Sequence, residues 1–97
     1  MRHFYRTQLQ PDDVLAHADT FFPTIGQQRT ANAKRERTFI GPLGTLTMSV
    51  KKEGGHYTFV EVHTDQMGES RLDRNAKKFF VELHRAATPS YRLEAAY

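Results

Sequence analysis

Two clusters of basic side chains are the residues best suited to chemistry in this sequence. Each carries a charge of +3, the first within residues 29–37 and the second within residues 71–78. Because Lys and Arg neutralise phosphates, two such clusters could flank a nucleic-acid backbone or hold another polyanion. The side chains that we assign to this role are Arg35, Arg37, Arg74, Lys77 and Lys78.

Both clusters also have a purely structural interpretation. Charged side chains protect an exposed edge strand from aggregation, which would suit residues 29–37. Cations on a solvated helix face look the same in sequence as a binding surface, and near the start of a helix they oppose its dipole. The sequence leaves both interpretations open.

The aromatic residues of segment 57–63 form a second candidate site. Val60 and Val62 share one face with Thr58, whereas Tyr57 and Phe59 lie on the other face. Rings on a sheet surface can pack against a second copy of the chain, line a ligand pocket or stack nucleic-acid bases. We expect an interface or a ligand at Tyr57, Phe59, Phe79 and Phe80, with dimerisation as the preferred role of the first two.

The five histidines form no recognisable metal or catalytic motif. The chain has no HxH or HExxH spacing, although His63 could form a site with Glu61 or Asp65. No serine lies in a nucleophile elbow, and no glycine-rich segment has the pattern of a phosphate-binding loop. The sequence therefore ranks an enzyme below a binding protein, and it predicts no cofactor and no metal.

The chain has the length of a single domain, residues 1–97, with a composition typical of folded proteins. It contains no Cys, which excludes disulfides and thiolate chemistry. It has neither a start of signal-peptide type nor a run of about 18 apolar residues. We therefore expect a cytoplasmic protein that does not enter the membrane, and its net charge of +3 admits anionic partners.

Hydrophobic periodicity predicts the elements that position these residues. Strands are expected at residues 2–9, near 38–40, at 45–51 and at 56–64. Helices with one apolar stripe are expected from Pro11 to near Phe22, and from Ser70 or Asp73 until Pro89 stops the helix. Turns at residues 41–44 and 54–55 join the last three strands, and residues 89–97 form a C-terminal tail.

This order predicts an α+β fold of two layers: a strand, a helix, a three-stranded antiparallel meander and a final helix. Both helices are expected on one face of the sheet, because each apolar stripe must be buried against the apolar face of the sheet. Tyr57 and Phe59 would then lie on the reverse of the sheet.

The element order resembles three known folds. The opening strand, the helix from Pro11, the two turns and the long final helix are similar to a shortened helix-grip domain of START and polyketide-cyclase-like proteins. That resemblance implies a cavity between the sheet and the final helix. The order also resembles a half-repeat of the TATA-box-binding protein, in which two copies join their sheets over nucleic acid. Residues 11–87 alone follow the order of the double-stranded-RNA-binding domain, and such likeness transfers no function by itself.

We therefore expect a non-enzymatic binding module that forms a homodimer and binds nucleic acid or another polyanion. One alternative is a small apolar ligand between the sheet and the helix of Phe79 and Phe80, as the helix-grip resemblance implies. Another is a structural or adaptor protein. Steep salt dependence would favour the polyanion, and a solidly packed interior would remove the apolar ligand.

Overall fold

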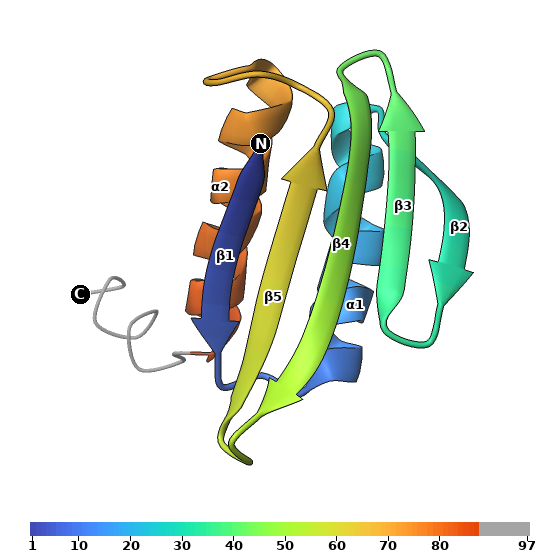
Figure 1. The fold of residues 1–97 in the computed structure, drawn as a ribbon. Coiled ribbons are helices and arrows are strands. Elements are labelled where there is room, and N and C mark those ends of the chain that lie inside the picture. Colours follow the sequence, from blue (N-terminus) through green and yellow to red (C-terminus); the bar gives the residue numbers. More distant parts are fainter. Residues whose placement is uncertain (88–97) are drawn as a thin grey trace, which may run out of the picture.

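A five-stranded antiparallel sheet is covered on one face by two helices (Figure 1). The computed structural model describes residues 1–87, without the side chains of residues 31 and 32. The strands lie in the order β1-β5-β4-β3-β2. In chain order the elements are β1 (Arg2–Thr7), α1 (Pro11–Phe21), the 3-10 helix η1 (Phe22–Ile25), β2 (Gln28–Ala33), β3 (Glu36–Gly41), β4 (Gly44–Glu53), β5 (Tyr57–Thr64) and α2 (Arg71–Ala87). The predicted α+β class is confirmed.

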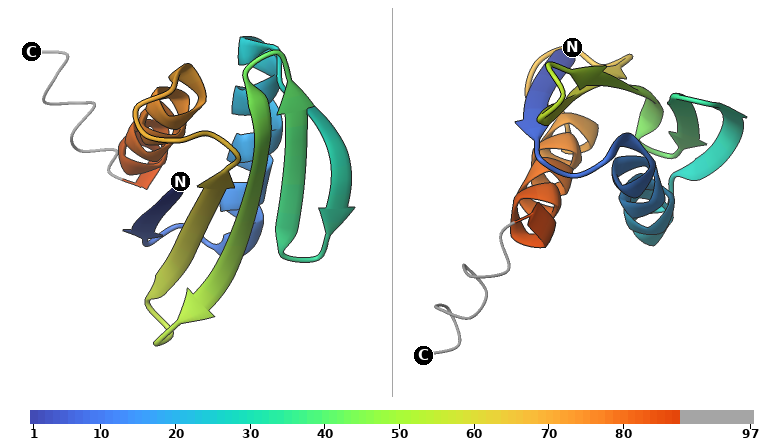
Figure 2. Two further views of the ribbon diagram at one scale, coloured as in Figure 1. Left: turned by 45° about the horizontal axis from the view of Figure 1, so that its top comes forward. Right: turned by 90° about the horizontal axis from the view of Figure 1, so that it is seen from below.

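Both helices lie on the same side of the sheet, as their apolar stripes predict (Figure 2). α2 packs against β1 and β5, and α1 packs against β4. The core between the two layers consists of Val14, Leu15, Ala18, Phe22, Phe39, Leu46, Met48, Val50, Val60, Val62, Leu72, Ala76, Phe79 and Leu83. The other side of the sheet, which we call the outer face, is not covered by any element within residues 1–87.

β2 is not among the strands that hydrophobic periodicity predicts, although the structural interpretation of residues 29–37 placed an exposed edge strand in this region. It extends the predicted three-stranded meander to four strands. It pairs with β3 from Gln28 opposite Ile40 to Ala33 opposite Glu36, with an irregularity between Arg29 and Ala31. Because β2 is an edge strand whose described side chains are exposed, backbone hydrogen bonds suffice to hold it and no apolar alternation is needed.

The turn between β4 and β5 is formed by the predicted glycine pair. Gly54 and Gly55 have φ angles of 62° and 79°, which residues with a side chain rarely adopt. The register that follows buries Val60 and directs Tyr57 and Phe59 to the outer face. The alternation predicted for this segment is therefore confirmed.

The ends of the other elements differ little from expectation. α1 begins at Pro11 as predicted, whereas β1 ends at Thr7 rather than at Leu9. No helix within residues 1–87 is both long and apolar enough to cross a membrane. The tail predicted at residues 89–97 lies outside the described residues.

Candidate functional site

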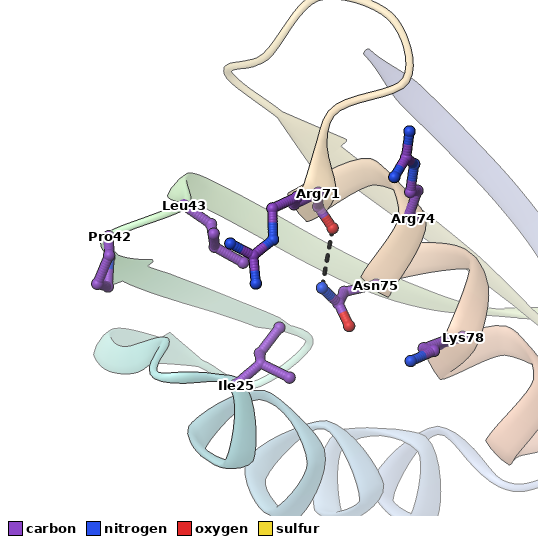
Figure 3. A pocket seen from close by; sticks show the side chains of 7 residues that line it. All are labelled: Ile25, Pro42, Leu43, Arg71, Arg74, Asn75 and Lys78. Carbon is purple, nitrogen blue, oxygen red and sulfur yellow. Dashed lines mark hydrogen bonds between the residues drawn. The ribbon is translucent and has the colours of Figure 1, made fainter.

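A groove lies on the helical side of the domain, between the first half of α2 and the loop that joins β3 to β4 (Figure 3). Its volume of about 600 Å³ is that of a small-ligand pocket. We call it the basic groove. Its lining residues are Ile25, Pro42, Leu43, Arg71, Arg74, Asn75 and Lys78.

The polar wall of the basic groove comes from one face of α2. Arg71, Asn75 and Lys78 are spaced i, i+4 and i+7, which places them in one row along the helix. Figure 3 shows these three side chains extending toward the opposite wall, whereas Arg74 stands at the rim and points another way. The Asn75 amide donates a hydrogen bond to the carbonyl oxygen of Arg71 at 2.8 Å.

The opposite wall is apolar, and a buried glutamine holds it in place. The side-chain amide of Gln27 donates to the carbonyl oxygen of Gly44 at 2.8 Å and accepts from the backbone N–H of Leu43 at 3.3 Å. A Cβ at Gly41 would collide with this fully buried side chain. The loop therefore presents Pro42 and Leu43 to the groove in a fixed conformation.

The charge of the basic groove is not compensated. No carboxylate lines it, and Arg71, Arg74 and Lys78 form no ion pair with any residue that the structure describes. All three side chains are exposed. Outside the groove, the hydrogen bond and the charge of Lys77 lower the pKa of Glu69, and the charge of Arg74 adds a smaller effect in the same direction.

Two of the predicted polyanion-binding residues, Arg74 and Lys78, line this groove. Lys77 lies outside its lining, although it is adjacent to Lys78 in sequence, and it binds Glu69 at 2.8 Å. Arg71 belongs to the same basic cluster in the sequence, and the helical spacing of 71, 75 and 78 was the signal that could have selected it.

The first basic cluster is engaged in structural ion pairs. Arg29 and Arg37 both bind the carboxylate of Asp19 on α1, at 3.0 and 3.2 Å. The Arg37 side chain is only 14% exposed, and Arg35 approaches Asp12 at 4.0 Å. These contacts fasten the β2–β3 hairpin to α1. In Figure 1, the turn of this hairpin and the start of α2 lie at opposite ends of the sheet, so the structure does not bring the two clusters together.

The outer face carries the second candidate site. Tyr57 and Phe59 of β5 are joined by Phe4 of β1, whose ring centroid lies 5.5 Å from that of Phe59. Phe4 is 54% exposed and Tyr57 is 46% exposed. The guanidinium of Arg6 lies 4.9 Å from the centroid of Phe59, a cation–π contact. Sequence reasoning missed Phe4 because only the pairing of β1 with β5 brings it beside Phe59.

Two arginines of the outer face lie beside glutamates, whereas Lys51 of β4, opposite Phe59, forms no ion pair with a described residue. Arg6 binds Glu53 at 2.7 Å, and Arg2 lies 3.8 Å from Glu61. The hydroxyl residues of β4, Thr45, Thr47 and Ser49, alternate with the buried side chains of that strand and so share this face. The outer face is therefore aromatic and polar, and it offers an anion little net charge.

Phe79 and Phe80 pack inside the domain. Phe79 is fully buried, and its ring centroid lies 5.6 Å from that of Phe21 and 5.1 Å from that of Phe22. Phe80 is partly buried and stacks on Tyr5 at 5.2 Å. Burial raises the pKa of the Tyr5 hydroxyl. These rings fill space between the layers that an apolar ligand would need.

A buried polar cluster that the sequence did not reveal ties the start of α2 to the sheet. The carboxylate of Asp73 is fully buried and bonds to Ser70 at 2.6 Å, His3 at 2.7 Å and Thr64 at 2.8 Å. Burial raises the pKa of Asp73, but the hydrogen bonds from Ser70, His3 and Thr64 outweigh it and lower the pKa from 3.8 to about 2. The Ser70 hydroxyl also accepts from the backbone N–H of Asp73 at 3.0 Å, which caps the start of α2.

This cluster has the residue types of a nucleophilic triad but a different order of bonds. The Ser70 hydroxyl donates to Asp73, whereas a nucleophile would donate to the histidine. We therefore interpret the cluster as the anchor of α2. Among residues 1–87, no group of three or more His, Cys, Asp or Glu side chains is placed to hold a metal.

Comparison with known proteins adds no relative, because neither a family model nor a curated protein matches the sequence. The functional inference accordingly rests on the basic groove and the outer face.

Proposed function

We propose that the domain binds polyanions, with nucleic acid as the principal candidate, through the basic groove. The supporting observation is that three exposed cations line one groove and have no carboxylate partner among the described residues. Arg74 is three residues from Arg71 and four from Lys78, so the like charges repel each other along the helix. A bound anion would relieve this repulsion.

The spacing of the cations suits a chain of phosphates better than a single one. With a rise of about 1.5 Å per residue, Arg71 and Lys78 are separated by about 10 Å along the axis of α2. One strand of B-form DNA carries about three phosphates over that length. The groove can therefore contact successive phosphates of one strand.

The test is the salt dependence of oligonucleotide binding, measured by fluorescence anisotropy on the full chain. We expect the affinity to fall steeply with salt, because binding releases counterions. The triple variant Arg71→Ala, Arg74→Ala, Lys78→Ala should bind about a hundredfold more weakly at low salt, and its salt slope should be smaller by about two units. Lys77→Ala is the matched control and should bind almost normally. Salt-insensitive binding, or a triple variant that binds like the parent, would refute the proposal.

A second proposed function, self-association, is favoured by the outer face. Phe4 and Tyr57 leave about half of their surface in water beside Phe59, and the neighbouring Arg2 and Arg6 are paired with glutamates. A face with apolar rings and balanced charge can pack against a second copy of itself without repulsion. Phe4→Ser should lower the apparent mass in light scattering and leave oligonucleotide binding unchanged. A monomeric parent protein at high concentration would refute this role.

Between the helix-grip domain and the half-repeat of the TATA-box-binding protein, we propose the half-repeat as the better guide to the fold. The helix-grip domain implies a cavity between the sheet and the final helix, and the packing of Phe79 and Phe80 gives no support for one. The small-apolar-ligand hypothesis loses support for the same reason.

A further inference from the structure

We propose that the basic groove prefers single-stranded nucleic acid over a duplex; this inference rests on the polyanion-binding function proposed above. The reason is the chemistry of its two walls. Arg71 and Lys78 line the α2 side, whereas Ile25, Pro42 and Leu43 line the side opposite (Figure 3). Phosphates alone would use only the first wall.

A duplex and a single strand differ in what they can offer the apolar wall. In a duplex the faces of the bases are stacked inside, and the protein meets phosphates, sugars and base edges. In a single strand an unstacked base can turn its face to the protein and lie against apolar side chains. A single strand can thus place phosphates on Arg71 and Lys78 and a base on Leu43.

The apolar wall is rigid, as a binding wall should be. Gln27 is fully buried and forms hydrogen bonds with both the N–H of Leu43 and the carbonyl oxygen of Gly44. The loop is therefore already ordered before a ligand binds. A preformed wall loses little conformational entropy on binding, which increases the affinity gained from a packed base.

Asn75 supplies a polar group between the two walls. Its amide nitrogen is used by the carbonyl oxygen of Arg71, whereas its side-chain oxygen accepts no hydrogen bond from the described residues. In Figure 3 this side chain extends into the groove. Its oxygen can accept a hydrogen bond from an amino or imino group on the edge of a base. In a duplex these groups are already used in base pairing, whereas in a single strand they are free.

The experiment compares three probes on the unmodified full chain at one salt concentration. The probes are a labelled DNA strand of about ten nucleotides, the same strand annealed to its complement, and inorganic polyphosphate as a competitor. We expect the single strand to bind about tenfold more tightly than the duplex and polyphosphate to compete weakly. Equal affinity for the single strand and the duplex would overturn the inference but leave the proposed function standing. Failure of all three probes to bind would overturn both.

Variants of the two walls provide an independent check. Leu43→Ala should weaken binding of the single strand about fivefold and leave duplex and polyphosphate binding unchanged. Leu43→Met keeps a large apolar side chain at this position and should bind the single strand like the parent protein. Lys78→Ala should weaken binding of all three probes. Thermal unfolding checks that each variant is folded. If Leu43→Ala weakens the binding of all three probes equally, the apolar wall does not contact a base and the inference fails.

Discussion

The basic groove and the outer face lie on opposite sides of the sheet and differ in how their charges are used. In the groove, Arg71 and Lys78 face solvent without a carboxylate partner among the described residues, whereas on the outer face Arg6 and Arg2 lie beside glutamates. A count of basic residues cannot separate the two surfaces. The cations of the groove are more available to an anion than Arg2 and Arg6 are, because no carboxylate competes for them.

The same contrast exists between neighbours on one helix. Lys77 and Lys78 are adjacent and identical in type, yet Lys77 binds Glu69 and only Lys78 lines the groove. The side chains of consecutive residues in an α-helix point about 100° apart around the axis, so neighbouring residues contact different surroundings. Position on the helix therefore decides which lysine serves the groove.

The largest expected effect concerns the anchor that holds the basic groove in place. Asp73→Asn removes a buried charge that accepts bonds from His3, Ser70 and Thr64. We expect the free energy of unfolding to fall by about 3 kcal/mol, because asparagine is neutral and has only one acceptor oxygen, so its NH2 group faces a buried donor. Denaturant unfolding followed by circular dichroism at neutral pH measures this loss. The exposed Asp13→Asn is the control and should change stability by less than about 1 kcal/mol.

The pH dependence of stability tests the same carboxylate. The pKa of Asp73 is about 2 in the folded protein, below its ordinary value of 3.8. The ionised carboxylate therefore adds to the free energy of unfolding above pH 4, and this stabilisation is lost as the pH falls toward 2. This shift corresponds to about 2 kcal/mol. The difference in unfolding free energy between the parent and Asp73→Asn should shrink by this amount between pH 5 and pH 2. A constant difference would mean that the charge of Asp73 does not stabilise the fold.

Charge reversal at adjacent lysines tests whether the groove, rather than net charge, determines binding. Lys78→Glu and Lys77→Glu change the total charge equally, so any difference between them reflects position. We expect about a tenfold larger loss of oligonucleotide affinity for Lys78→Glu, since only this residue lines the groove. Anisotropy titrations at matched salt give the comparison. Equal losses would show that long-range attraction alone draws the anion.

Arg37 should matter for stability and not for binding. Arg37→Met keeps the aliphatic stem but removes the ion pair with Asp19 and the hydrogen bonds to the carbonyl oxygens of Ala33 and Glu36. We expect a loss of about 1 kcal/mol in thermal or denaturant unfolding and unchanged oligonucleotide affinity. A clear loss of affinity in a folded variant would place the first basic cluster in the binding surface after all.

The smallest effect is expected on the outer face. The side chains of Arg6 and Glu53 are 59% and 42% exposed, so water screens their ion pair strongly. Glu53→Gln should change the free energy of unfolding by less than about 0.5 kcal/mol. It should leave oligonucleotide affinity unchanged as well, because this side of the sheet is remote from the groove. An increase in affinity would indicate that the freed Arg6 recruits the anion to the outer face.

The layers of the fold could be predicted because burial leaves a periodic trace in the sequence. The alternation around Val60 and Val62, the stripe on α2 and the glycine pair at 54–55 each marked an element. β2 left no such trace, since an edge strand with exposed side chains needs only backbone pairing. The charges of residues 29–37 indicated an exposed edge strand there, but neither its bounds nor its partner could be predicted.

The candidate sites could be predicted only in part, since they depend on contacts between distant segments. The cations of α2 stand in one short stretch, but nothing in the sequence brings Ile25 and Leu43 opposite them. The bond between His3 and Asp73 joins residues 70 positions apart. Likewise, the carboxylates that compensate the first basic cluster come from α1, which is separate in sequence.

The first strand has its neighbours near the far end of the chain. β1 pairs with β5, and His3 reaches the first turn of α2. Contacts between such remote segments close large loops and form slowly compared with local hairpins. On the ribosome, the opening segment must wait until nearly all of the domain has emerged before it can dock. Within the described domain, β1 is thus synthesised before its partners β5 and α2 and must wait for both.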